Sequence, residues 1–305
     1  MPTFPFVTAD VFTDRPFGGN PVAVFPNGRG LTERQMQLVA REFNLSETVF
    51  VLPPDRPEHT RQLRIFTPAA ELPFAGHPTL GAAYVLAAIG EVALQGNQTD
   101  IVFEEGVGPV PVRIVAVDDR PVFAQLSVAR LPDRGPQPPA ASELAAMLSL
   151  EPSDFAAEPP EVWSCGVPFT FVALAGLDPL RRARLRRDVW ESVLAASAAP
   201  AAFMFCRETE REASDIHARM FAPDMGIAED PATGAAAAAL AGYLGSRADR
   251  SDRTLRWIVE QGFEMGRPSI LEVEADVRNG DTVAVRVGGA SVLISRGEME
   301  IPTDV

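Results

Sequence analysis

Hydrophobic and polar residues alternate along much of the chain, a pattern typical of strands with one buried face. The β-rich runs fall into two series. The first series comprises residues 6–11, 23–25, 48–52, 63–67, 101–104 and 110–117, and the second comprises 169–174, 202–206, 216–221, 269–275, 282–288 and 291–296. Many short strands with only a few helical runs between them predict an α+β fold.

Two of the predicted helices have an unusual pattern, because residues 79–89 and 233–244 are apolar nearly all round. A helix without a polar face must be buried on every side. Since strands dominate both halves, we expect each half to be a sheet wrapped around one central helix. An amphipathic helix is predicted over 32–43, with Thr32 as its N-cap, and further helices over 141–148 and 182–196.

The two halves carry the same ordered markers, which indicates an internal duplication. The motif Arg-x-Phe-x-Pro at 64–68 recurs at 219–223. His77-Pro78 with a following Gly-Ala-Ala corresponds to Asp230-Pro231 with the same continuation, and Glu-Glu-Gly at 104–106 corresponds to Glu-Gln-Gly at 260–262. The offsets of 155, 153 and 156 residues are nearly constant. We therefore predict two pseudo-symmetric lobes that share a cleft.

The length of 305 residues agrees with two domains. The best linker candidate is the Pro-rich polar stretch 131–139. We therefore divide the chain into an N-terminal lobe, 1–130, and a C-terminal lobe, 131–305, and allow for terminal strands that cross between the lobes.

Composition excludes several classes of enzyme. All 27 basic residues are arginines. A chain without lysine cannot form the Schiff base of pyridoxal-phosphate enzymes or of lysine aldolases, and it has no P-loop lysine. A metal enzyme is disfavoured because the sequence has no His-Glu-x-x-His, no Cys-x-x-Cys and no pair of histidines at ligand spacing.

The net charge of −14 argues against nucleic acid and against anionic membrane surfaces as partners. The longest apolar run, 234–245, is too short to span a bilayer, and no basic segment precedes an apolar stretch at the N-terminus. Two cysteines, Cys165 and Cys206, do not make a disulfide framework. We expect a cytoplasmic protein.

The duplicated segments are the candidate site. Pro78 and Pro231 suit the first helical turn, which would make His77 and Asp230 the N-cap residues or their neighbours. Helix N-termini bind carboxylates or phosphates, and glycines allow the backbone to approach a ligand closely. Proline and glycine also simply start and pack helices, but the repetition in register favours a functional role. We expect a small anionic ligand.

Glu47 is a further candidate, since a carboxylate at the start of the apolar run 48–52 can be desolvated and can carry a proton. A glutamate at the start of a strand is more often exposed, so the signal is weak by itself. His59 lies in a polar stretch and is expected to be solvated. No role is expected for His217.

Four segments, 17–24, 46–50, 76–81 and 229–234, resemble the signature blocks of the phenazine-biosynthesis PhzF-like family, in order and over almost the whole chain. The resemblance implies the diaminopimelate-epimerase fold: two lobes, each a mostly antiparallel sheet around a central helix, with the active site between them. It implies isomerisation without a cofactor, and homodimers are common in the family.

The resemblance also implies roles for individual residues. Glu47 matches the residue that takes a proton from one carbon and returns it to another, and His77 and Asp230 match residues that hold and polarise the substrate. The substrate-binding candidates, of which the last three match backbone contacts to a carboxylate, are Asn20, Gly76, Gly234 and Ala235.

Two departures from the family pattern bear on the substrate. Many members have serine where this chain has Ala235, which leaves open a substrate other than the phenazine intermediate. Related epimerases use a thiol pair at the positions of His77 and Asp230, and neither is cysteine here, which disfavours epimerisation by two thiols. A racemase or epimerase of an amino-acid-like substrate, and a binding protein that keeps the fold without turnover, remain as alternatives.

Overall fold

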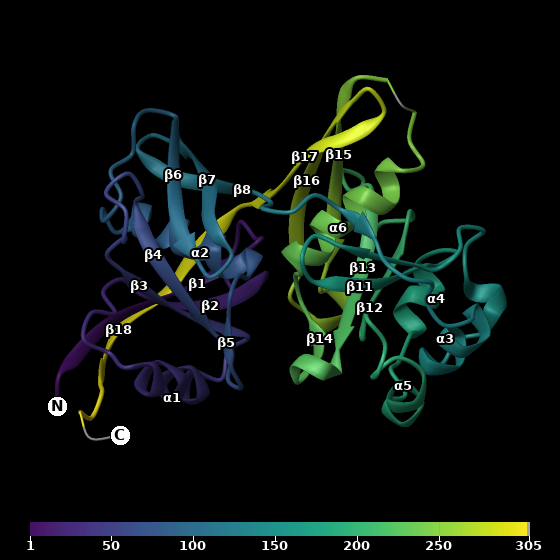
Figure 1. Ribbon diagram of the computed structural model, residues 1–305, viewed down its shortest axis with the longest axis horizontal. Helices are drawn as coiled ribbons and strands as arrows, with labels where there is room; N and C mark the ends of the chain where they lie inside the picture. Colours follow the sequence, from purple (N-terminus) through teal and green to yellow (C-terminus); the bar gives the residue numbers. More distant parts are fainter. Residues whose placement is uncertain (250, 304–305) are drawn as a thin grey trace. The chain divides into compact units, whose positions relative to one another are not determined.

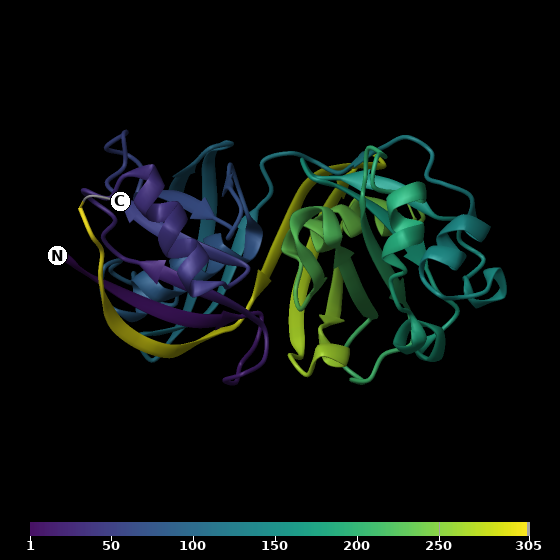
Figure 2. The ribbon, with the colours of Figure 1, turned by 90° about the horizontal axis from the view of Figure 1, so that it is seen from below.

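The computed structural model describes residues 1–249 and 251–303, and it divides into two compact units (Figure 1). Unit 1 contains Met1–Ala129 together with the chain from Gly288 onwards, and unit 2 is Arg130–Val287. The last strand of the chain therefore lies in unit 1, where it pairs along its whole length with the first strand (Figure 2). The sequence-based division had placed this strand in the second lobe, while allowing terminal strands to cross.

Unit 1 is a sheet that surrounds one helix. Its helices are α1 (Glu33–Phe43) and α2 (Gly76–Ala88). Its strands are β1 (Thr3–Val11), β2 (Asn20–Phe25), β3 (Glu47–Leu52), β4 (Arg61–Phe66), β5 (Glu71–Leu72), β6 (Gln98–Glu105), β7 (Gly108–Val117), β8 (Arg120–Ser127) and β18 (Ser291–Glu300). The order is β18-β1-β2-β3-β4-β6-β7-β8, with β2–β3 and β4–β6 parallel and the other neighbours antiparallel.

Unit 2 has the same design with more helices. These are α3 (Ala141–Met147), α4 (Leu177–Arg182), α5 (Arg187–Val193) and α6 (Gly234–Gly245), with short 3₁₀ turns at Pro152–Asp154, Pro223–Met225 and Phe263–Met265. Its strands are β9 (Asp133–Arg134), β10 (Glu161–Ser164), β11 (Pro168–Ala173), β12 (Ala201–Cys206), β13 (Ile216–Ala222), β14 (Ile227–Asp230), β15 (Arg253–Gln261), β16 (Ser269–Arg278) and β17 (Asp281–Gly289). The order β9-β10-β11-β12-β13-β15-β16 has β11–β12 and β13–β15 parallel.

The duplication is confirmed at the level of strand pairing. The parallel pairs β2–β3 and β4–β6 of unit 1 correspond to β11–β12 and β13–β15 of unit 2. In each unit the central helix lies in the chain between the two strands of the second pair: α2 follows β4 and β5 and precedes β6, and α6 follows β13 and β14 and precedes β15. Individual contacts repeat as well. Arg64 binds both carboxylate oxygens of Glu71 and lies over Phe66, while Arg219 does the same with Glu229 and Phe221.

The two apolar helices are buried as predicted. Helix α2 packs against strands β1, β2, β3, β7, β8 and β18 of unit 1. Helix α6 packs against β10, β11 and β16 of unit 2. Gly81 makes this close approach possible, since a Cβ at this position would lie 2.6 Å from Cγ1 of Val22 and 2.9 Å from Cγ2 of Val11.

The remaining helices pack on the outer faces of the sheets. Helix α1 begins with the predicted cap: Thr32 Oγ1 accepts a hydrogen bond from the Gln35 amide at 3.2 Å, and Gln35 Oε1 accepts from the Thr32 amide at 2.8 Å. The single helix predicted over 182–196 is wrong. Helix α4 ends at Arg182 because the chain turns to an extended conformation at Ala183, and α5 starts only at Arg187.

Candidate active site

Unit 1 brings Glu47 and His77 together, although thirty residues separate them in the chain. Glu47 is the first residue of β3 and lies opposite Val22 on the parallel strand β2. His77 is the second residue of α2, whose N-terminal turn packs on these strands. Oε2 of Glu47 lies 3.3 Å from Nε2 of His77, and the two side chains are only 10% and 6% exposed. Glu47 is thus the buried strand-start carboxylate that the sequence predicted.

His77 is held as a neutral imidazole. Burial lowers the pKa of His77 to about 3, although a hydrogen bond to the backbone of Pro21 acts in the opposite direction. Pro21 has no amide hydrogen, so the imidazole donates to its carbonyl, and among the residues that the structure describes Nε2 has no hydrogen-bond partner. The hydrogen is therefore on Nδ1, and Nε2 presents a lone pair toward Glu47. At neutral pH this contact is a neutral acceptor beside a carboxyl group, not an ion pair.

The segment before β2 fixes the carbonyl that orients His77. Asn20, a substrate-binding candidate, is fully buried and opens β2 directly before Pro21. The buried Asp10 carboxylate accepts a hydrogen bond from the Phe17 amide at 2.7 Å. Gly19 has a φ of +62°, and a Cβ there would lie 2.2 Å from the carbonyl oxygen of Val11. Only glycine fits this loop, which explains part of the Gly-Gly-Asn-Pro signature.

Unit 2 carries Asp230, which is buried at the end of β14. The Thr233 hydroxyl donates a 2.6 Å hydrogen bond to Oδ2 of Asp230. Thr233, not Asp230, is the N-cap position of α6. The prediction that Pro231 lies in the first helical turn is therefore wrong for unit 2, whereas Pro78 does lie in the first turn of α2.

Gln261, which the sequence reasoning missed as a site residue, joins these groups. Its side-chain nitrogen donates to the Asp230 carbonyl at 2.7 Å and to Thr233 Oγ1 at 3.1 Å, and its side-chain oxygen accepts from the Thr233 amide at 3.2 Å. The hydroxyl of Thr233 thus accepts from Gln261 and donates to Asp230. The corresponding residue of unit 1 is Glu105, which contacts Thr79 on α2. Both residues belong to the third repeated marker, and that was the available signal.

The glycine candidates lie where the sequence placed them, at the helix starts. Gly76 and Gly234 are the first residues of α2 and α6 and are buried, and Ala235 is partly exposed as the second residue of α6. The first amides of a helix have no partner within the helix and point toward any ligand beyond its end. Each unit therefore offers one helix start beside one of the polar groups Glu47–His77 or Asp230–Thr233.

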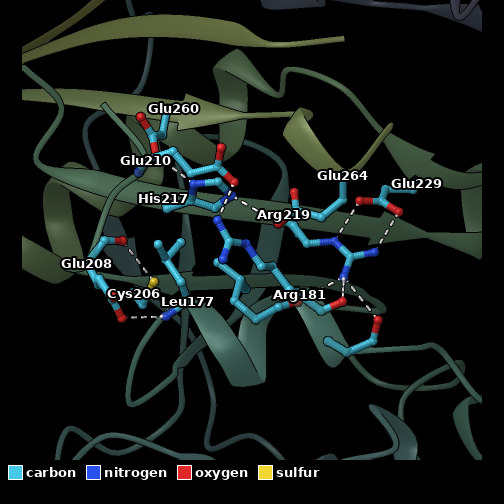
Figure 3. Close-up of polar contacts among 12 residues, drawn as sticks. Leu177, Arg181, Cys206, Glu208, Glu210, His217, Arg219, Glu229, Glu260 and Glu264 are labelled. Atoms are coloured by element: carbon cyan, nitrogen blue, oxygen red, sulfur yellow. Dashed lines mark hydrogen bonds and ion pairs between the residues drawn. The ribbon is translucent and has the colours of Figure 1, made fainter. Parts of the chain in front are cut away.

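The expectation that His59 is solvated is wrong, and His217, for which no role was expected, is also buried. His59 is largely buried, and its Nδ1 lies 2.7 Å from Glu104. His217 is fully buried, with Nδ1 at 2.6 Å from Glu260 and Nε2 at 3.1 Å from Glu264 (Figure 3). Burial lowers the pKa of His217, but the two carboxylates more than offset this and raise it to about 9.

Figure 3 shows that this histidine belongs to a structural network. Arg219, beside His217 on β13, binds Glu229 through two hydrogen bonds of 2.8 and 2.9 Å. It also donates to the carbonyls of Leu180 and Ala183 at the end of α4. These contacts tie α4 to the sheet and satisfy helix carbonyls that would otherwise lack donors.

The thiols are poor candidates for chemistry. Burial raises the pKa of Cys165 and of Cys206 to about 12, so both stay protonated at neutral pH. Within residues 1–249 and 251–303, no three His, Cys, Asp or Glu side chains cluster closely enough to hold a metal ion. In the same part of the chain, no helix combines the length and the apolar character needed to cross a membrane.

The chain is similar to known proteins over nearly its whole length. The family model for phenazine biosynthesis-like proteins, PhzC-PhzF, matches residues 9–297. A Mesorhizobium japonicum protein named an uncharacterized isomerase is 41% identical, with 99% of this chain and 100% of the relative covered. The trans-2,3-dihydro-3-hydroxyanthranilate isomerase of Pseudomonas fluorescens is 36% identical, with 96% of this chain and 98% of that protein covered.

Among solved structures, a Bacillus anthracis protein of the PhzF family has a TM-score of 0.89 at 27% identity, with 99% of this chain and all of that chain covered. A hydroxyproline epimerase from Agrobacterium vitis has a TM-score of 0.63 at 12% identity and shows the shared fold alone, over 97% of this chain and 91% of that one. The chain thus has the α+β fold of PhzF and proline-racemase-like proteins, and it is an isomerase. It belongs to the PhzF family of phenazine biosynthesis-like proteins.

Proposed function

We propose that this isomerase moves a proton between two carbons of a small carboxylate substrate without a cofactor, and that Glu47 carries the proton. The observation that supports this most directly is the buried contact between Glu47 and His77. A carboxyl group at a desolvated site, beside a neutral hydrogen-bond acceptor, is suited to general acid–base catalysis.

The neutral state of His77 decides where the proton resides. Glu47 takes a proton from a substrate carbon next to a double bond, and the electron pair delocalises over the neighbouring carbons. A histidine of ordinary basicity would then compete for this proton. His77, with its pKa near 3, accepts a hydrogen bond at Nε2 but does not keep the proton. The proton stays on Glu47 and returns to the far carbon, so the double bond shifts and no atom is gained or lost.

The helix starts supply the binding of the substrate. We propose that amides at Gly76, Gly234 and Ala235 bind its carboxylate, and that Asp230 and Asn20 hold its other polar groups. The acidic net charge does not prevent this, because local amides and helix dipoles dominate at short range. The first substrate to test is trans-2,3-dihydro-3-hydroxyanthranilate, on which several relatives are named as acting.

The test compares the wild type with Glu47→Gln, which keeps shape and hydrogen bonding but cannot accept a proton. Turnover should fall by about 10²–10⁴-fold while binding of substrate persists. Glu42→Gln, which changes an exposed carboxylate at the end of α1, is the matched control and should keep full activity. Near-normal turnover by Glu47→Gln would refute the role of Glu47 and make Asp230 the next candidate.

The deuterium content of product formed in heavy water distinguishes a mechanism with one base from a mechanism with two. Wild-type product should contain deuterium at the accepting carbon, diluted by the original proton when one carboxylate serves both carbons. Complete exchange with solvent would indicate a second base. A double-bond shift changes the absorbance of the substrate, whereas a racemase or epimerase changes only its optical activity, so the same reaction mixture distinguishes the alternative reaction.

A further inference from the structure

A buried carboxyl group of unit 1 has no assigned role in the proposed reaction. Glu105 is the last residue of β6 and is only 9% exposed. Its Oε1 lies 2.7 Å from Oγ1 of Thr79, in the first turn of α2, and its buried Oε2 has no hydrogen-bond partner within residues 1–249 and 251–303. Glu105 thus reaches the same helix turn that carries Gly76 and His77.

Counting hydrogens around Thr79 indicates which partner donates. Oγ1 of Thr79 also lies 2.8 Å from the carbonyl oxygen of Ala75, which can only accept. A hydroxyl has one hydrogen to donate. If Glu105 were ionised, two acceptors would compete for that hydrogen. If Glu105 is protonated, it donates to Thr79 and Thr79 donates to Ala75, so both short contacts are hydrogen bonds.

Unit 2 has the same arrangement with a residue that is neutral by its chemistry. Gln261 ends β15 as Glu105 ends β6, and each is followed by a glycine. The amide of Gln261 donates to Thr233, and Thr233 donates onward to Asp230. A protonated Glu105 would donate in the same direction, to Thr79, with Thr79 donating onward to the Ala75 carbonyl. A protonated Glu105 is the counterpart of this amide.

We propose that Glu105 is a positioning residue that stays protonated, donates to Thr79, and thereby keeps the start of α2 free of negative charge for an anionic substrate. This inference rests on the proposed function insofar as the substrate carboxylate binds at Gly76. An ionised Glu105 could not donate to Thr79. It would compete with the Ala75 carbonyl for the single hydroxyl hydrogen of Thr79, and it would repel an anion at the same helix start.

The surroundings of Glu105 favour the neutral form. Burial raises the pKa of Glu105 to about 8, and donation by the Thr79 hydroxyl to the ionised carboxylate acts in the opposite direction. The ionisable groups of its own strand and of the elements packed against it are Asp100 and Glu104 on β6, Arg61 and Arg64 on β4, Arg113 on β7, Glu71 on β5, and His77 and Tyr84 on α2. The arginines bind other carboxylates, namely Glu91, Glu71 with Glu33, and Asp100.

Stability as a function of pH tests the protonation without any substrate. A carboxyl group with a folded-state pKa above its unfolded value stabilises the protein fully below the unfolded pKa, near 4.5, and this is lost as pH rises to about 8. We expect the unfolding constants of the wild type and Glu105→Gln to diverge by up to about tenfold per pH unit in this window, in favour of Glu105→Gln. The reciprocal variant, Gln261→Glu, should acquire the pH dependence that Glu105→Gln loses.

Infrared spectroscopy of the wild type supplies a second measurement that does not depend on how the variant folds. A carbonyl band of a protonated carboxylic acid should persist at pH 7 and disappear with a midpoint near pH 8, and Glu105→Gln should lack it. A pH-independent stability difference together with the absence of this band would show an ionised Glu105 and overturn the proposal.

Kinetics with trans-2,3-dihydro-3-hydroxyanthranilate test the positioning. The KM of the wild type should rise on the order of tenfold above pH 8 with little change in kcat, because the ionised carboxyl repels the substrate anion. Glu105→Gln should show no such rise, and a KM of the wild type that stays flat to pH 9.5 would contradict the role. If the protein does not turn over this compound, the proposed substrate fails, while the stability and infrared measurements still decide the protonation of Glu105.

Discussion

His77 shows how one residue combines burial with a specific hydrogen bond. The carbonyl of Pro21 selects the Nδ1–H tautomer, and desolvation removes the positive charge that a histidine beside a carboxylate would otherwise carry. The unit therefore has an uncharged acceptor beside Glu47. Asp230 is treated differently, since it accepts a hydrogen bond from a hydroxyl that is itself held by an amide.

The contact between Thr233 and Asp230 gives a prediction at the scale of single residues. Thr233→Val keeps the shape of the side chain but removes the hydroxyl that donates to Asp230. A hydrogen bond to a charged group contributes about 1.5–3 kcal/mol, so kcat/KM should fall about 10- to 100-fold if Asp230 must be oriented. Thr233→Ser restores the donor and should recover most of the activity. Equal activities of the valine and serine variants would mean that Asp230 needs no such orientation.

The sequence singled out the candidate site residues more readily than their hydrogen-bond partners. Glu47, His77 and Asp230 stood out through the repeat and the family motifs. Gln261 and Glu105 did not, because a glutamine or glutamate before a glycine has no distinctive local chemistry. Their importance depends on parallel pairing of β4 with β6 and of β13 with β15, which brings strand ends to the start of a distant helix. No local pattern encodes that proximity.

At the scale of elements, the central helices were the most predictable feature. An apolar surface on all sides leaves burial as the only solution, and both helices lie within one to three residues of the predicted starts. The helix predicted over 182–196 was wrong because local propensity does not reveal tertiary capping. Arg219, from a strand distant in sequence, binds the last carbonyls of α4 and fixes its end.

The close approach of α2 to β1 and β2 gives a prediction at this scale. Gly81→Ala would place a methyl group 2.6 Å from Val22, whose branched, fully buried side chain has little freedom to move. Overpacking of this kind costs about 1–3 kcal/mol, partly offset by the better helix propensity of alanine. Urea unfolding should show a lower free energy of unfolding, and turnover should also fall because α2 carries His77.

Val22→Ala provides the matched control for this prediction. It opens space for the new methyl group, so the double variant Gly81→Ala/Val22→Ala should be more stable than the sum of the two single effects. Strict additivity would mean that the helix does not press on Val22, and that the close packing has no energetic consequence.

At the scale of the whole molecule, the duplication extends to buried charges. Glu104 accepts hydrogen bonds from the amides of Asp55 and Arg56 and contacts His59. Glu260 likewise accepts from the amides of Glu210 and Arg211 and contacts His217. The amide pairs are related by the same offset of 155 residues as the arginine motifs. Unit 2 differs in adding Glu264, which makes its histidine the centre of a network of two carboxylates.

This network should give unit 2 a stability that depends on pH. The pKa of His217 is raised from 6.5 to about 9, so its contribution is fully present below pH 6.5 and is lost as pH rises through about 9. Burial raises the pKa values of Glu260 and Glu264, but hydrogen bonds, first of all with His217, lower them overall. Their contribution is therefore present above about pH 4.5 and is lost in acid.

His217→Gln tests this expectation. Removing one member of a buried ionic cluster costs about 3–5 kcal/mol, so urea unfolding at pH 6 should show a loss of about this size. The difference from the wild type should shrink between pH 7 and 10, because the wild type loses its protonated histidine over that range. His59→Gln, which changes the corresponding contact of unit 1, should leave this alkaline loss in place. A difference that stays constant up to pH 10 would mean that His217 is neutral in the folded protein.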